Sequence, residues 1–524
     1  MEQVQTRWNG WGIPGYQDPL AVNEAAWRWL AQSFAMPALL ATPPRDLSDI
    51  VLPPSRLAER DRDLLSMQLG RFGVQQDVFE RARHAGGRSL TDLLRLRSGD
   101  LSSAPDAVLY PRNEIDVLAV LKFCAEHDIA VMPFGGGSGD SAPVRGSHRA
   151  VISLNLSDLN RVTAIDTVSG LAEIEAGITG PALERQLAAR GMTLGHRPDD
   201  FEFSSLGGWI AQPGTGQEAA RYGDVSDWLR GMRVATPQGL LKPSGLPDLK
   251  PLLVGSRGAF GVITGATVRI RAVPAKEDHR AYLFPDFASG LAAVREAHRT
   301  GLPHSFLHLS DDAETRLAQA LQRAGQEFDF LRHIFDVYLS VRRFDSGAAR
   351  LVAGFAGSES EAKSARRRLD GLAKRLGALP LGLDRDWEKQ RFIGGYRRDT
   401  FLDRGVSMDR QDFSTSWTRL PGLYVAVRAA LKQAMRNHAP RANAHGLVLC
   451  RLSAARSEGA TLTFTWLFPR ILTDGIAQAE HIRNAAMAAA SSVDPVHHGL
   501  QRDILRGIKQ VVDAKAILNP GAFL

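Results

Sequence analysis

Cysteine is nearly absent from this sequence. The 524 residues include two cysteines, Cys124 and Cys450, which are far apart in the chain and sit among apolar neighbours. Two isolated cysteines exclude a disulfide framework, and they are too few for a cysteine-rich metal site. We therefore expect a protein of a reducing compartment, the cytoplasm by default, with no bound metal.

Long apolar runs are also missing. No stretch of about 18 or more uncharged apolar residues occurs, which is the usual requirement for a membrane-spanning helix. The first residues lack the basic region, apolar run and small-residue cleavage site of a secretory signal. We expect a protein that is neither exported by a standard signal nor inserted through a membrane.

The charge balance is mildly basic. There are 64 Lys and Arg against 57 Asp and Glu, a formal net charge of +7, and the positive residues are spread along the chain. A nucleic-acid-binding protein would concentrate them in a recognisable module, so we do not expect nucleic acid as a partner. A small or lipid-like anionic substrate fits better. The basic run Arg366–Arg368 indicates either a solvated helix face or peripheral contact with an anionic membrane.

Composition and periodicity divide the chain into four parts. Residues 1–105 are rich in Trp, Pro, Arg and Leu, and proline pairs interrupt them, which predicts an irregular extension with short helices. Residues 106–275 are glycine-rich, whereas residues 276–490 alternate arginine-rich helices with strands. Residues 491–524 contain a last helix that a Pro-Gly pair terminates. We predict an α+β protein, and the sequence leaves a homodimer open.

A glycine loop follows a predicted helix at Asn113–His127 and a predicted strand at Ile129–Phe134. Consecutive glycines let backbone N–H groups turn toward one anion and approach it more closely than a Cβ would allow. The spacing is not the dinucleotide-binding G-x-G-x-x-G, because Asp140 stands at the third glycine, and no Walker G-K-[ST] follows. We interpret the loop as a pyrophosphate cradle, with a plain turn as the alternative. Its residues are Pro133, Phe134, Gly135, Gly136, Gly137, Ser138 and Gly139.

Two further segments combine glycine, small hydroxyl residues and a helix start. They are His196–Trp209 and Gly255–Thr264, and both lie in the glycine-rich part. Three such loops in one domain suggest a single extended cofactor.

Together these segments resemble the FAD-binding domain of the vanillyl-alcohol oxidase superfamily and the FAD-linked oxidases. Within that group the chain is similar to the alkyldihydroxyacetonephosphate synthase family. The resemblance implies a two-part FAD-binding domain of the vanillyl-alcohol oxidase type, an α/β cap domain for the substrate and a helical N-terminal extension. The motifs that carry it are Arg7–Gly12, Glu175–Gly180, Asp199–Trp209, Arg221–Asp224, Gly261–Thr264 and Leu518–Gly521.

The resemblance also implies chemistry and site residues. FAD is held without a covalent tether, and an ether bond forms on an acyl-dihydroxyacetonephosphate-like substrate through a flavin N5 adduct. Arg398 matches the family's substrate arginine, although a solvated basic stretch is the alternative, and His497 and His498 match a remnant of its histidine run. Beside the glycine loop, the residues implied around FAD are Asp199, Asp200, Phe201, Glu202, Phe203, Ser204, Ser205, Gln212, Pro213, Gly214, Thr215, Ser256, Arg257, Gly258, Ala259, Phe260, Gly261 and Val262.

One position departs from the family. Its catalytic tyrosine falls on the predicted strand Thr461–Phe468, where this sequence has Thr463. A threonine hydroxyl has a higher pKa and a shorter reach than a phenol, so it is a poor acid or base near neutrality. Alternation puts Thr463 on the face opposite Leu462 and Phe464, and alternation alone does not say whether that face lines the active site.

Three functions remain open at this point. The first is an FAD-dependent transferase of the alkyldihydroxyacetonephosphate synthase kind, which the whole-chain resemblance favours. The second is an FAD-dependent oxidase or dehydrogenase of a hydroxy acid or small biosynthetic alcohol, which can dispense with the missing phenol. The third is a non-catalytic flavin-binding protein that kept the fold.

Overall fold

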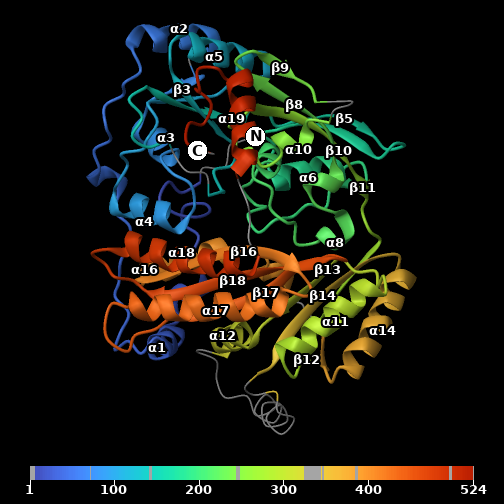
Figure 1. The fold of residues 1–524 in the computed structure, drawn as a ribbon. Helices are drawn as coiled ribbons and strands as arrows, with labels where there is room; N and C mark the ends of the chain where they lie inside the picture. The colour runs from blue at the N-terminus through green and yellow to red at the C-terminus, as the bar shows by residue number, and fades with distance from the viewer. Residues whose placement is uncertain are drawn as a thin grey trace.

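The computed structural model describes residues 6–70, 72–140, 144–243, 248–323, 344, 347–383, 387–494 and 499–522. Figure 1 shows the glycine-rich part above a large sheet and its helices, with the N-terminal extension along one side of both. Within these residues no helix is long and apolar enough to cross a membrane, and no cluster of metal-binding side chains occurs. The mixture of helix and sheet confirms the predicted fold class.

The N-terminal extension is tied to both larger parts. Trp27 of its first helix packs edge-on against Phe401 of the cap at 5.9 Å, and Leu93 joins the core under the large sheet. Leu65 belongs instead to the core of the glycine-rich part. Its elements are η1 (Pro19–Val22), α1 (Glu24–Ser33), η2 (Leu47–Asp49), α2 (Glu59–Leu69), β1 (Val74–Gln75), α3 (Val78–Arg83) and α4 (Leu90–Ser98).

A four-stranded sheet, ordered β1-β2-β4-β3, joins β1 of the N-terminal extension to the first three strands of the glycine-rich part. Asn113 caps helix α5 (Glu114–Glu126) by accepting the Asp116 N–H, and the chain then enters β3 (Ala130–Phe134), as predicted. β3 runs parallel to β4 (Val151–Asn155), which pairs in turn with β2 (Ala107–Leu109). The glycine loop therefore starts at the carboxyl end of a buried strand.

A five-stranded sheet, ordered β5-β6-β10-β8-β9, completes the glycine-rich part. All its neighbouring strands are antiparallel. Its strands are β5 (Val162–Asp166), β6 (Leu171–Glu175), β8 (Leu229–Thr236), β9 (Gly239–Leu241) and β10 (Val262–Arg269). The helices around it are α6 (Gly180–Ala188), α7 (Leu206–Ala211), α8 (Ala219–Tyr222), α9 (Val225–Trp228) and α10 (Lys250–Leu253), and a small ribbon joins β7 (Met192–Thr193) to β11 (Arg271–Ala272).

The C-terminal segment returns to the glycine-rich part. Helix α19 (Gly499–Val512) packs Leu505 and Ile508 against the core of the five-stranded sheet. Val131 on β3 donates its N–H to the carbonyl of Ile517 at 2.8 Å and accepts the N–H of Asn519 at 2.8 Å. The Asn519 side chain also donates to the carbonyl of Arg257 at 2.6 Å. This segment therefore braces two of the predicted cofactor loops.

The cap is a seven-stranded sheet, ordered β15-β12-β14-β13-β17-β18-β16, with antiparallel neighbours throughout. Figure 1 shows α11, α14 and α17 on the side of this sheet away from the glycine-rich part. The strands are β12 (Lys276–Phe284), β13 (Phe306–Ser310), β14 (Ala349–Gly357), β15 (Leu379–Leu383), β16 (Val406–Ser416), β17 (Leu447–Ala455) and β18 (Gly459–Pro469). The helices are α11 (Phe287–Arg299), α12 (Asp312–Arg323), α14 (Glu359–Arg375), α15 (Trp387–Gln390), α16 (Gly394–Asp403), α17 (Leu420–Asn437) and α18 (Gly475–Val493).

Alternation along β18 separates two faces of the cap sheet. Leu462, Phe464 and Trp466 are fully buried in the core beneath the sheet, as the pattern predicts. Thr463 therefore points to the opposite face, where the glycine-rich part lies.

Candidate functional site

The glycine loop presents a row of unsatisfied N–H groups. Within the described residues, the backbone N–H groups of Gly135, Gly136, Gly137, Ser138 and Gly139 have no hydrogen-bond acceptor. Gly137 has φ 67°, a left-handed conformation that favours glycine. Successive N–H groups in such a turn form a concave site for an anion. The loop therefore fits the pyrophosphate of FAD.

The predicted cofactor segments meet at this loop. Ser138 donates its hydroxyl to Asp200 at 2.7 Å. A Cβ on Gly139 would lie 2.7 Å from the side-chain oxygen of Gln212, and one on Gly258 would lie 2.8 Å from the Pro133 ring. Segments that are far apart in sequence thus lie together around the glycine loop. A single extended cofactor that contacts all three segments requires this arrangement.

Gly136 is needed for a reason that the sequence does not show. A Cβ at this position would overlap the carbonyl oxygen of Phe203 and would lie 2.7 Å from its carbonyl carbon. The missing side chain lets two protein loops touch. This contact, rather than the approach of a phosphate, is what the structure shows to require glycine here.

Several predicted cofactor residues lie in the apolar core. The side chains of Phe201, Ala259, Phe260 and Val262 are buried there, so only their backbone can face FAD. By contrast, Pro213, Gly214 and Thr215 are exposed.

The loop that begins at Gly255, the third of the glycine-containing segments, is hydrogen-bonded to the end of α7. Gly255 and Arg257 donate their N–H groups to the carbonyls of Ile210 and Ala211, each at 2.9 Å. Arg257 and Gly258 take φ values of 49° and 76°. Because the N–H groups of Gly255 and Arg257 already donate to protein carbonyls, they are not free to bind the cofactor. This loop therefore contributes to the shape of the site.

Thr463 lies in a polar network on the inner face of the cap sheet. Its side chain is 9% exposed, and its hydroxyl lies 2.7 Å from Asp412 Oδ1 and 2.9 Å from Ser453 Oγ. Asp412 is on β16 and Ser453 is on β17, the two strands that flank β18. The hydroxyl is therefore engaged by protein groups.

Two arginines that the sequence analysis did not single out lie on the strands beside β18: Arg451 is opposite Thr463, and Arg410 is opposite Thr465. Arg410 on β16 pairs with Asp199 of the predicted FAD segment, and Arg451 on β17 pairs with Glu314 at 2.5 Å. Burial raises the pKa of Asp199, but the charges of Arg410 and Arg451 and a hydrogen bond from Gln217 together outweigh it and hold the pKa of this carboxyl below its usual range. The Arg410–Asp199 pair places the inner face of the cap sheet against the cofactor loops.

Arg398 projects from α16 and is left without a partner. Its Nε is enclosed by protein, and among the described residues its side chain makes no hydrogen bond or ion pair. Burial lowers the pKa of Arg398, and the carboxylates of Asp399 and Asp140 oppose that change. Asp140 directly follows the glycine loop, so its influence on Arg398 indicates that Arg398 lies near the cofactor site. The enclosed Nε distinguishes Arg398 from a solvated surface arginine. The position suits an anionic substrate group.

His497 and His498, the predicted acid–base pair, lie outside the described residues. A different histidine is near the site: His308 on β13 is 7% exposed, and its Nε2 has no described partner. Burial lowers the pKa of His308 to about 3, with the nearby charge of Arg451 adding to the effect. His308 is therefore neutral in the physiological range.

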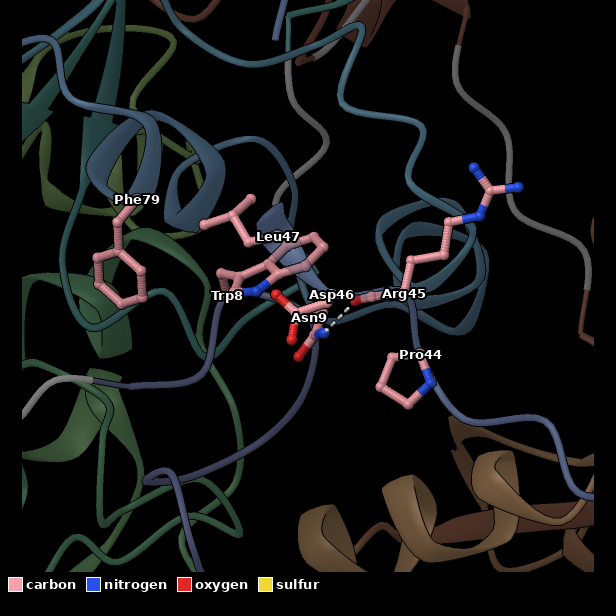
Figure 2. Close-up of a pocket in the computed structure, with 7 residues that line it drawn as sticks. All are labelled: Trp8, Asn9, Pro44, Arg45, Asp46, Leu47 and Phe79. Carbon is pink, nitrogen blue, oxygen red and sulfur yellow. Dashed lines mark hydrogen bonds between the residues drawn. The ribbon is translucent and has the colours of Figure 1, made fainter. Parts of the chain in front are cut away.

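A hollow of about 380 Å³ opens elsewhere, on the N-terminal extension (Figure 2). Figure 2 shows the Asn9 amide directed at the carbonyl of Arg45, which it reaches at 3.4 Å. This hollow contains none of the predicted cofactor residues. Its lining residues are Trp8, Asn9, Pro44, Arg45, Asp46, Leu47 and Phe79.

Two family models match the chain. The FAD binding domain matches residues 105–243, and the C-terminal domain of FAD linked oxidases matches residues 274–523. The chain therefore belongs to the FAD-linked oxidases and is an FAD-dependent enzyme. The predicted cofactor is confirmed, whereas its non-covalent attachment stays a prediction.

Within this class the chain is an alkyldihydroxyacetonephosphate synthase-like member. It is 28% identical to the alkyldihydroxyacetonephosphate synthase of Trypanosoma brucei brucei, with 99% of this chain and 92% of the relative covered. The same enzyme of Dictyostelium discoideum is also 28% identical, with 91% and 83% covered. A solved alkyldihydroxyacetonephosphate synthase structure superposes with a TM-score of 0.87 at 25% identity, with 98% and 97% covered.

Proposed function

We propose that this chain exchanges the acyl group of an acylated dihydroxyacetone-phosphate-like substrate for a long-chain alcohol, with no net redox change. In this exchange the carbon–oxygen bond to the departing carboxylate breaks and one to the alcohol oxygen forms. Similarity to the synthases over nearly the whole chain supports the proposal. The observation that carries it is Arg398, whose Nε is enclosed and whose side chain has no partner among the described residues, within reach of the charge of Asp140 at the end of the glycine loop.

Each part of the site has a distinct task in this proposal. The N–H groups of Gly135 to Gly139 hold the cofactor pyrophosphate, and Arg398 holds the substrate phosphate with a two-pronged hydrogen bond. Bound FAD supplies a reactive ring nitrogen to the substrate carbon. The inner face of the cap sheet covers the reacting groups and limits the access of water.

Proton transfer is the step for which Thr463 is poorly suited, because its hydroxyl is engaged by Asp412 and Ser453. We therefore assign proton transfer to His497 or His498 on the sequence resemblance. His498→Ala should then lower the rate by about 10²- to 10⁴-fold and remove a pH–rate limb near neutrality. An unchanged pH–rate profile would contradict this assignment.

The test of the proposed function combines activity with a variant at Arg398. Purified FAD-loaded protein is incubated with acyl-dihydroxyacetonephosphate and a fatty alcohol, and the ether product is measured by mass spectrometry. Arg398→Lys keeps the positive charge but loses the planar fork, so KM should rise while the FAD content stays unchanged. Absence of the ether product, or an unchanged KM, would count against the proposal.

A dehydrogenase or oxidase of a hydroxy acid is the second candidate, and Thr463 favours it. The engaged hydroxyl of Thr463 replaces the family's phenol, which hydride transfer to a flavin does not need. Anaerobic bleaching of the flavin by a panel of hydroxy acids would select this candidate. Protein that neither bleaches nor forms an ether would instead indicate a non-catalytic flavin-binding protein.

A further inference from the structure

Among the described residues Arg398 has no hydrogen-bond or ion-pair partner, although the charges of three acidic residues act on it. Asp399 follows it on α16, Asp140 ends the glycine loop, and Asp409 lies on β16; Arg410 is the positive neighbour. An arginine among carboxylates normally forms an ion pair, and a paired guanidinium is less available to a ligand. What occupies each carboxylate therefore decides whether Arg398 can bind an anion.

Asp399 is engaged by the N-terminal extension. It is 3% exposed, and its Oδ2 accepts the Trp11 N–H at 2.6 Å and an N–H of the Arg7 guanidinium at 3.1 Å. A Cβ on Gly10 would overlap the same oxygen, so the segment lies directly on the carboxylate. Its other oxygen, Oδ1, is enclosed without a described partner.

Asp409 is engaged from the other side, by α18. It is 6% exposed, and both of its oxygens accept from Arg483, at 3.0 Å from Nε and 2.6 Å from Nη2. This is the two-pronged geometry that binds a carboxylate most firmly. Asp140, the third acid, is exposed and forms no described ion pair with Arg398.

The segment Arg7–Gly12 is itself fixed to the cofactor site. The buried Arg88 donates its backbone N–H to the carbonyl of Gly139 and its guanidinium to the carbonyl of Arg7, each at 2.9 Å. Trp11 packs edge-on against Phe203 at 5.6 Å. Through these contacts Arg7 has a defined position relative to the glycine loop.

We propose that Arg7 and Arg483 are positioning residues that occupy Asp399 and Asp409 and thereby keep Arg398 free for the anionic group of the substrate. This inference rests on the proposed role of Arg398. Losing either arginine releases a buried carboxylate whose charge acts on Arg398. That carboxylate then competes with the substrate anion for the guanidinium.

The test measures anion affinity on FAD-loaded protein. Dihydroxyacetone phosphate and inorganic phosphate serve as probes in calorimetric titrations, and FAD content is checked for every variant. Arg483→Gln and Arg7→Gln should each weaken Kd by about 10- to 100-fold, the range expected when a charge-assisted hydrogen bond is lost. Arg506→Gln, which breaks an exposed pair with Asp503 on α19, is the matched control and should leave Kd unchanged.

A rescue variant separates competition from general disruption. Arg483→Gln combined with Asp409→Asn removes the released charge, so it should restore most of the affinity, and Arg483→Lys should restore part of it. Weak binding that the double variant does not restore would assign Arg483 a purely structural role and overturn the inference. If Arg483→Gln does not fold, Arg7→Gln decides, because the Arg7 side chain is partly exposed and its loss is milder.

Arg398→Gln separates the two proposals. If this variant binds the probes as tightly as the original protein, the proposed role of Arg398 fails. If it binds weakly while Arg7→Gln and Arg483→Gln bind normally, the role of Arg398 stands and the positioning inference fails.

Discussion

Alanine at position 136 is the sharpest test of how the cofactor site is assembled. The added methyl group would overlap the carbonyl oxygen of Phe203 and would lie 3.1 Å from the Cα of Ser204. Both obstacles are backbone atoms, so no side chain can rotate out of the way. The glycine loop and the segment Asp199–Ser205 must move apart.

The size of the effect follows from this overlap. Forcing an extra methyl group into a close-packed contact typically costs about 1–3 kcal/mol. If the loops separate to relieve the strain, binding FAD must bring them together again, which weakens Kd by about 5- to 150-fold. The apoprotein itself should unfold at nearly the normal temperature.

Fluorescence titration of apoprotein with FAD measures this change, and thermal unfolding with and without FAD measures its linkage to stability. Gly422→Ala in α17 is the control, because a Cβ there meets nothing within 4 Å. It should bind FAD normally. Normal FAD affinity in Gly136→Ala would refute the conclusion that this loop contact builds the site.

Three further predictions concern the cofactor and the cap. Because no family-type tether is recognisable, acid precipitation should release all the flavin into solution as FAD, and flavin left on the washed precipitate would show a covalent bond. Gly214→Val adds a side chain where no protein atom lies within 4 Å, so weaker FAD binding at unchanged apoprotein stability would place the cofactor beside Gly214, and unaltered binding would remove it from the site. Burial raises the pKa of Asp311 to about 6 from a usual 3.8, against the opposing hydrogen bond from the Glu314 N–H. The protonated form of Asp311 is therefore favoured in the folded state, and the free energy of unfolding of the original protein should fall by about 2–3 kcal/mol as pH rises from about 4 to 7. The free energy of unfolding of Asp311→Asn should fall less over the same range. Urea midpoints that change with pH in parallel for the two proteins would contradict this prediction.

Local patterns in the sequence predicted the elements that carry the cofactor loop. Asn113 marked the start of α5, and the apolar run before Gly135 marked β3. These features depend on neighbouring residues, and neighbouring residues are what a single sequence displays. Alternation on β18 likewise placed Thr463 opposite the buried aromatic residues.

Contacts between distant segments were beyond such reasoning. Arg7 and Asp399 are 392 positions apart, and no local pattern around either residue predicts that they are in contact. Arg410 and Arg451 look like ordinary charged strand residues in the sequence, and only strand pairing places them opposite Thr465 and Thr463. The overlap that makes Gly136 necessary arises in the same way, since Phe203 reaches it only in the folded chain.

The hydrogen bonds from Ile517 and Asn519 to Val131 have a consequence for the order of events during synthesis. A chain leaving the ribosome presents β3 and its glycine loop long before residues 517–519 exist. Until these residues arrive, the strand before the loop is paired only with β4, and the loop at Arg257 lacks the amide of Asn519. We therefore expect capture of FAD to be a late step in the maturation of this enzyme, after translation has passed residue 519.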